Sequence, residues 1–310
     1  MLDGGKSRKR FGVFAWMVLA YNIPVILWGA YVRASFSGDG CGAHWPFCNG
    51  QVIPHNMAAP MAIEFAHRMT TGFDSAAVIA MCCWAFLAFP KRHAVRLYSA
   101  LSVVFISIEA LLGMGLVLLR YVAKDQSAGR AWYLSAHLTN TMLLLGALTV
   151  TAWAAAGRFA PDSVSEVLRN GRLAGALAVT VGVSITGVIA ALGDTLFPAS
   201  SLSAGVRQDF SSATSLLLRL RMVHPLIAII GAAYLIWAAA GVLKHTPAAG
   251  RVITLTLFQL AAGAVNISLL APIWMQLFHL FMADLLWISV VVLVLENAAV
   301  RRPTAALTYV

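Results

Sequence analysis

The chain has 310 residues, of which 60% are hydrophobic and only 11% are charged, and its formal net charge is +10. Soluble domains carry about 25% charged residues, so this composition excludes a soluble globular protein and indicates a polytopic membrane protein. The basic residues lie in short segments between apolar runs. This is the topology signal of a membrane protein, and it argues against nucleic acid as a partner.

Eight apolar runs are each long enough to cross a bilayer as a helix, which takes about 20 residues. The sequence therefore predicts an all-α integral membrane protein with eight transmembrane helices. The predicted spans cover residues 11–33, 62–89, 95–120, 131–156, 173–193, 221–243, 251–271 and 273–296. Most of the 22 lysine and arginine residues fall on one side of these spans, and this side is predicted to be cytoplasmic. Both termini are then cytoplasmic (N-in/C-in), and segments 34–61 and 194–220 are extracytoplasmic loops.

The two halves of the chain share a pattern of residues in the same order. The motif AHLTNTMLLL in the fourth span resembles FHLFMADLLW in the eighth. Glu109 precedes a glycine by four residues in the third span, as Gln259 does in the seventh. These matches predict two parallel-repeat four-helix bundles, residues 1–157 and 173–310, joined by a cytoplasmic linker, 158–172.

The segment between the first two spans carries more chemistry than a connection needs. It contains Cys41 and Cys48, and two thiols in an oxidising compartment can form a structural disulfide or take part in redox chemistry. Glu64 and His67 follow at the start of the second span, three residues apart and therefore on one helical face. The stretch indicates a redox loop beside a helix end that bears an acid or a metal ligand.

Four of the eight histidines recur near the starts of the even-numbered spans: His67, His137, His224 and His279. The even-numbered spans run in the same direction, so all four side chains are predicted at similar depth near the outer face. A hydrogen bond at a helix end would explain one such histidine, but four at equivalent positions favour metal ligation. Two histidines per half suit the axial ligation of haem iron, whereas zinc takes three or four ligands. We therefore predict one haem pocket in each half.

Basic and polar side chains near that face extend the prediction. The basic residues are Arg33, Arg68, Arg219 and Arg221. Their guanidinium groups can pair with haem propionates or anchor at lipid headgroups. Propionate pairing is favoured for Arg33 and Arg68, which flank the first loop, and the alternatives weigh equally for the other two. Glu109 and Gln259 are expected to hydrogen-bond between helices.

Together, the segment GAYVRASFSGDGCGAHWPFCNG, the motif EFAHR and the later helix-start histidines resemble the haem A synthase family over almost the whole chain. The resemblance implies a multi-pass enzyme of the plasma membrane with an extracytoplasmic active face. Such enzymes oxidise a methyl group of haem O to a formyl group by successive hydroxylations, which gives haem A for terminal oxidases. It also implies that His67 and His137 hold the substrate haem, and that His224 and His279 are axial ligands of a resident haem b.

The same resemblance places the family's acidic residue on Glu64 and its loop cysteine pair on Cys41 and Cys48. Arg221 stands three residues before His224, where Glu64 stands three before its own histidine. A carboxylate can accept a proton or stabilise positive charge during methyl oxidation, whereas an arginine suits a propionate. We therefore expect the chemistry in the first half. Three features depart from the family: the loop after the fifth span lacks a second cysteine pair, His44 replaces an aspartate, and Glu109 stands where glutamine is expected.

Two other functions compete with this one. A non-catalytic dihaem b-type electron carrier would stack its haems near opposite faces, whereas all four histidines are predicted at one face. A haem prenyltransferase would need an Asp-rich motif, which the sequence lacks. Haem O and the lipid bilayer are the expected partners, and a haem O synthase, an electron donor and a second copy of the chain are further candidates.

Overall fold

The computed structural model describes residues 4–158, 169–210 and 216–301. These residues form helices throughout and contain no β-strand, only an isolated bridge between Cys48 and Gln51. The described helices are α1 (Gly4–Ala34), α2 (Ala59–Ala88), α3 (Ala94–Leu118), α4 (Ala128–Ala155), α6 (Gly171–Leu196), α7 (Leu202–Asp209), α8 (Leu216–Ala240), α9 (Ala248–Ser268) and α10 (Ile273–Val300).

All of these helices except α7 are long and apolar enough to cross a membrane, eight in all within the described residues. The prediction of an all-α integral membrane protein with eight spans is confirmed. The boundaries differ by a few residues. α1 begins at Gly4 rather than at residue 11, because lysine and arginine are good helix formers and extend the helix beyond its apolar part. α8 begins at Leu216, five residues before the predicted start.

α7 was not predicted. It lies within the segment that the sequence assigned to a loop between the fifth and sixth spans. The side chain of Ser201 caps it by accepting a hydrogen bond from the backbone N–H of Ala204. This short helix is too polar and too brief to give a hydropathy signal.

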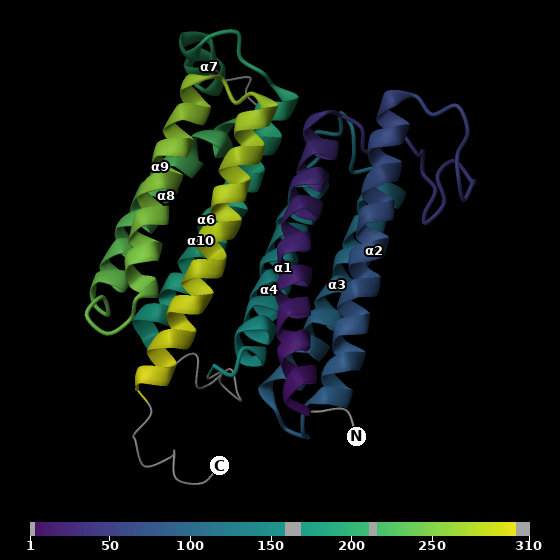
Figure 1. Ribbon diagram of the computed structural model, residues 1–310. Coiled ribbons are helices and arrows are strands. Elements are labelled where there is room, and N and C mark those ends of the chain that lie inside the picture. Colours follow the sequence, from purple (N-terminus) through teal and green to yellow (C-terminus); the bar gives the residue numbers. More distant parts are fainter. Residues whose placement is uncertain (1–3, 159–168, 211–215, 302–310) are drawn as a thin grey trace.

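Two groups of four spanning helices lie side by side (Figure 1). In the first, α1 packs on α2 and α4, and α3 packs on the same two helices. The second repeats this arrangement: α6 packs on α8 and α10, and α9 packs on both. α1 and α4 of the first group contact α10 of the second, and α4 also contacts α6. The described part of the predicted linker, residues 158 and 169–172, adjoins these groups, and residues 159–168 lie outside the described residues.

The start of α1 and the end of α10 lie at one end of the molecule (Figure 1). The first loop, residues 35–58, and α7 lie at the opposite end, which we call the loop end. The repeat, the division at residue 157 and the membrane orientation stay predictions.

The centre of the molecule is packed through α4, the most buried of the spans. The indole nitrogen of Trp287 on α10 donates to the backbone oxygen of Met142 on α4 at 2.7 Å. Gly146 gives this ring its space, since a Cβ there would lie 3.7 Å from the indole. Small residues and hydrogen bonds hold helices together where lipid removes the hydrophobic driving force.

Candidate functional site

Each of the four predicted histidines packs against a glycine of the preceding membrane-spanning helix. The pairs are Gly29 with His67, Gly113 with His137, Gly187 with His224 and Gly263 with His279. A Cβ would lie 3.1 Å from the imidazole at Gly29 and Gly187, 3.2 Å at Gly263 and 3.7 Å at Gly113. Because glycine has no Cβ, each ring can lie directly against a neighbouring backbone, and this packing recurs in all four helix pairs.

The four histidines lie at similar depth, six to nine residues after their helices begin. They are therefore deeper than the first turn; α2, α4 and α8 start earlier than predicted, and α10 starts at Ile273 as predicted. His67 and His137 are close enough for their charges to interact, as are His224 and His279. The structure thus brings together the two histidines of each half. No group of three or more histidine, cysteine, aspartate or glutamate side chains that could hold a metal ion occurs among the described residues.

Two of the rings are oriented by a hydrogen bond through Nδ1. His137 Nδ1 lies 2.8 Å from Glu109 Oε1, and His224 Nδ1 lies 3.0 Å from Thr186 Oγ1. This leaves Nε2 of both rings to face a ligand. Thr186 had not been singled out, although it stands directly before Gly187 in the sequence.

The other two rings carry buried nitrogens that lack a partner within the described structure: Nδ1 of His67 and Nδ1 of His279. An unpaired buried polar atom costs about 1–3 kcal/mol, so these atoms indicate a missing ligand or donor. Gln259 Nε2 lies 3.2 Å from His279 Nε2. Two imidazoles in each half, with ring nitrogens available, are a donor set that fits haem iron.

Glu64 joins the start of α2 to the first loop. Its side chain is buried, and its Oε2 accepts a hydrogen bond from the backbone N–H of Cys41 at 2.8 Å. Its Oε1 accepts from Arg68 Nη2 at 2.5 Å. Arg68 Nη1 also donates to the backbone oxygens of His44 at 2.7 Å and Phe47 at 2.9 Å. Both charged side chains are therefore engaged with the loop in this structure.

The cysteines of the loop lie beside these contacts. The structure joins Cys41 to Cys48 by a disulfide, with Cα atoms 4.4 Å apart, and buries both residues. Gly40 brings the loop against the start of α2, where a Cβ would lie 2.5 Å from the backbone of Pro60. The loop is thus fixed where α2 begins, two turns before His67.

Arg33 connects the two halves. Its Nη1 donates to the backbone oxygen of Ala191 at 2.7 Å and to Thr195 Oγ1 at 3.1 Å, both on α6. Its Nη2 donates to Gln276 Oε1 on α10 at 3.2 Å. The predicted propionate partner therefore has protein partners in the opposite half, and residue spacing gave no sign of them.

Arg221 stands three residues before His224, as Glu64 stands three residues before His67. Like Glu64, it binds the chain segment that precedes its own helix at the loop end. Its Nη2 lies 2.5 Å from Asp209 Oδ1 at the end of α7, and its Nη1 lies 3.3 Å from Asp194 Oδ1 near the end of α6. A negatively charged residue thus fixes the preceding segment in the first half, and a positively charged residue does so in the second. Arg219, by contrast, is exposed.

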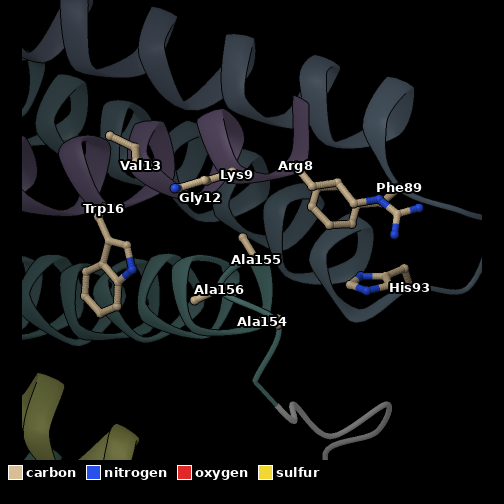
Figure 2. Close-up of a pocket in the computed structure, with 11 residues that line it drawn as sticks. Arg8, Lys9, Gly12, Val13, Trp16, Phe89, His93, Ala154, Ala155 and Ala156 are labelled. Atoms are coloured by element: carbon tan, nitrogen blue, oxygen red, sulfur yellow. The ribbon is translucent and has the colours of Figure 1, made fainter. Parts of the chain in front are cut away.

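A hollow of about 460 Å³ lies at the other end of the molecule, where α1 begins. Figure 2 shows Arg8, Trp16, Phe89 and His93 around it, close to the end of α4. It lies away from the four histidines and forms no part of their site.

The fold and site define a polytopic helical membrane protein with a pair of buried histidines in each of two four-helix groups. A family model described as cytochrome oxidase assembly protein, COX15-CtaA, matches residues 12–291. The chain belongs to this family, and the resemblance to haem A synthases is confirmed.

Named relatives carry two different names and match the chain to different extents. The chain is 39% identical over 308 residues to a Thermus thermophilus protein named protoheme IX farnesyltransferase, covering 94% of this chain and 50% of that protein. It is 31% identical over 179 residues to a heme A synthase of Exiguobacterium sibiricum, covering 58% of each. It is 38% identical over 112 residues to a heme A synthase of Halalkalibacterium halodurans, covering 36% of this chain and 37% of that protein. The chain thus spans about half the length of its Thermus relative.

Proposed function

We propose that this protein is a membrane oxidoreductase that converts haem O to haem A. Two successive hydroxylations each replace a C–H bond of one methyl substituent by a C–OH bond, and each takes its oxygen atom and two oxidising equivalents from an external oxidant. The resulting gem-diol loses water to leave a formyl group. The observation that carries the proposal is the pair of histidines in each half, every ring lying against a glycine, in a chain of this family. Two of its relatives are named heme A synthase.

The two halves divide the work in this proposal. His67 and His137 hold the substrate haem O, and His224 and His279 hold a resident haem b. The bound haem b supplies a one-electron redox centre. Support for the division comes from the first loop, because Glu64 and the cysteine pair have no counterpart in the described second half, where Arg221 and α7 stand instead.

Glu64 is the residue proposed to act on the substrate, by accepting a proton or stabilising positive charge. Its contacts with Cys41 and Arg68 add a second role, because they hold the loop. Arg33, Arg68 and Arg221 are proposed to bind propionates. Each already donates to protein oxygens, so a propionate would share or replace those contacts.

The test compares purified variants by haem content and by the pigments they form in a host that makes haem O. His224→Ala and His279→Ala should lose the resident haem. His67→Ala and Glu64→Ala should keep it and stop making haem A. Glu64→Gln is the matched variant, since its amide oxygen can still accept the hydrogen bond from the Cys41 N–H while the side chain carries no charge. Loss of haem A formation in Glu64→Gln, as in Glu64→Ala, assigns the loss to the carboxylate itself. Full haem A yield from Glu64→Ala would contradict the proposed role of Glu64 in the reaction.

The name of the Thermus relative raises haem prenylation as a rival activity. This chain matches only half of that protein, and its eight aspartates are scattered, with no cluster to hold magnesium diphosphate. Expression in a host that makes only haem b separates the activities, because a prenyltransferase would produce haem O there. A dihaem electron carrier would instead show reversible haem reduction with no pigment conversion in either host.

The proposed setting is the plasma membrane, with the loop end extracytoplasmic. Haem O and lipid are the proposed partners. A haem O synthase that delivers the substrate, an electron donor and a second copy of the chain remain candidates.

A further inference from the structure

The second histidine of each half has a polar neighbour at an equivalent place, and the two neighbours differ in charge. Glu109 on α3 contacts His137, and Gln259 on α9 contacts His279. Each stands four residues before the glycine that faces the same ring, so each reaches that ring from one turn away on the same helix. The position on the helix is shared, but the charge and the contacted ring nitrogen are not: Glu109 meets Nδ1 of His137, and Gln259 meets Nε2 of His279.

In the first half, the contacts of Glu109 indicate that its carboxyl group is ionised. Oε1 lies 2.8 Å from His137 Nδ1 and also accepts from Thr141 Oγ1. Oε2 accepts from Asn140 Nδ2 at 2.5 Å. The amide of Asn140 can only donate through this atom, and a carboxylate that receives several donors is acceptor-only. The imidazole therefore donates through Nδ1, which leaves the lone pair on Nε2.

In the second half the partner is neutral. Gln259 Nε2 lies 3.2 Å from His279 Nε2, and its Oε1 is buried with no partner within the described residues. Whichever end of the amide faces the ring, it brings no charge. A carboxylate that accepts a ligating imidazole's N–H raises the basicity of that ligand, and an amide does so far less.

We propose that Glu109 is a positioning residue that orients His137 and makes it the stronger electron donor, so that haem iron in the first half has a lower reduction potential than it would with glutamine there. This rests on the proposed function, which makes His137 a ligand of the substrate haem. Hydrogen bonding to an axial ligand is one of the levers by which a protein sets haem potential. The first half thus favours ferric iron where methyl oxidation takes place, and Gln259 leaves the resident haem without that bias.

Another buried carboxyl provides a matched control. Asp74 on α2 is close enough to interact electrostatically with Glu109, but it is bonded to Asn22 Nδ2 at 2.9 Å and not to a histidine. Removing its charge tests whether any buried carboxyl of this half shifts the potential, or whether the contact with His137 is needed.

The experiment is a potentiometric titration of the purified full-length protein carrying its haems. Haem O or haem A and haem b are followed separately by their reduced absorption bands. Glu109→Gln should change the reduction equilibrium of the first-half haem at least tenfold toward ferrous iron, which is 59 mV for a one-electron couple. It should leave the haem b potential unchanged. Gln259→Glu should shift haem b in the opposite direction, and Asp74→Asn should move either haem by less than threefold.

A potential in Glu109→Gln within threefold of the wild type, or no different from that of Asp74→Asn, overturns the proposal. If one substitution abolishes haem binding at its own site, the reciprocal substitution decides the matter alone. Failure of the proposed function looks different: His67→Ala and His137→Ala would then leave the haem content of the protein unchanged. The measurement of the reduction potentials needs no turnover. If Glu109 only held helices together, Glu109→Gln would leave both reduction potentials unchanged, so that role is distinguished from the proposed one.

Discussion

At the scale of single residues, the site depends on four glycines, because they have no Cβ atom. An imidazole that lies against a neighbouring helix backbone needs the space of a Cβ, and the helix that provides it gives up helix propensity of about 1 kcal/mol per glycine. The same cost is accepted next to all four histidines. The polar partners of the rings stand on the same helices as these glycines and differ from ring to ring: Glu109, Thr186 and Gln259.

We expect Gly187→Ala to reduce the haem content of the purified protein severalfold. The added Cβ would lie 3.1 Å from His224 Cε1, so the ring must move away from the position in which it is proposed to ligate haem. Gly182→Ala on the same helix is the control, because its Cβ would meet nothing within 4 Å. It should raise helix stability by about 1 kcal/mol and leave the haem in place. Reduced-minus-oxidised spectra per mole of protein measure the difference, and equal haem content in the two variants would count against close packing as the reason for the glycine.

At the scale of elements, the spanning helices could be predicted because each is defined by a long apolar run. Their ends were less predictable, since Lys6, Arg8 and the residues around them are polar but continue α1. The histidines were predictable as a recurring position within the even-numbered spans. Their contacts were not, because the partner of a side chain depends on the rotation of the neighbouring helix, which spacing along one helix does not set.

The arginines illustrate that difference most clearly. The sequence favours propionate pairing for Arg33 and leaves propionate and lipid headgroup as equal alternatives for Arg221. In the structure Arg33 bonds to the opposite half, and Arg221 bonds to α7, an element that hydropathy could not reveal. Nothing in the sequence indicated that Glu64 binds the first loop or that Arg221 binds α7.

We expect Arg221→Ala to release α7 from the rest of the molecule. The substitution leaves Asp194 and Asp209 without their shared cation, in a contact where the arginine side chain is 12% exposed. Breaking such a pair costs about 3 kcal/mol, which corresponds to local opening that is about a hundredfold more frequent. Hydrogen exchange across residues 202–209 measures it. Arg207→Ala, an exposed arginine on the same helix, should leave exchange unchanged. Unaltered protection in Arg221→Ala would show that other contacts hold α7.

At the scale of the whole molecule, the two four-helix groups are joined near the loop end by Arg33 and in the interior by the bond from Trp287 to Met142. Both histidine pairs lie nearer the loop end than the bond from Trp287 to Met142 does. In the proposed function, an electron donor or a haem carrier that serves both sites would therefore approach from one side of the membrane, and the orientation of the chain decides which side that is.

We expect the loop end to be extracytoplasmic, since most lysines and arginines lie at the opposite end. Val52 in the first loop is 69% exposed, and Lys244 lies in the exposed connection between α8 and α9 at the other end of the molecule (Figure 1). Each position is changed to cysteine in a Cys82→Ser, Cys83→Ser background, which removes the free thiols of the described chain. An impermeant maleimide should label Val52→Cys in intact cells to near completion and label Lys244→Cys only after lysis. The reverse pattern would mean the opposite orientation, with both histidine pairs near the cytoplasmic side, and a donor that reduces the proposed haems would then act from the cytoplasm.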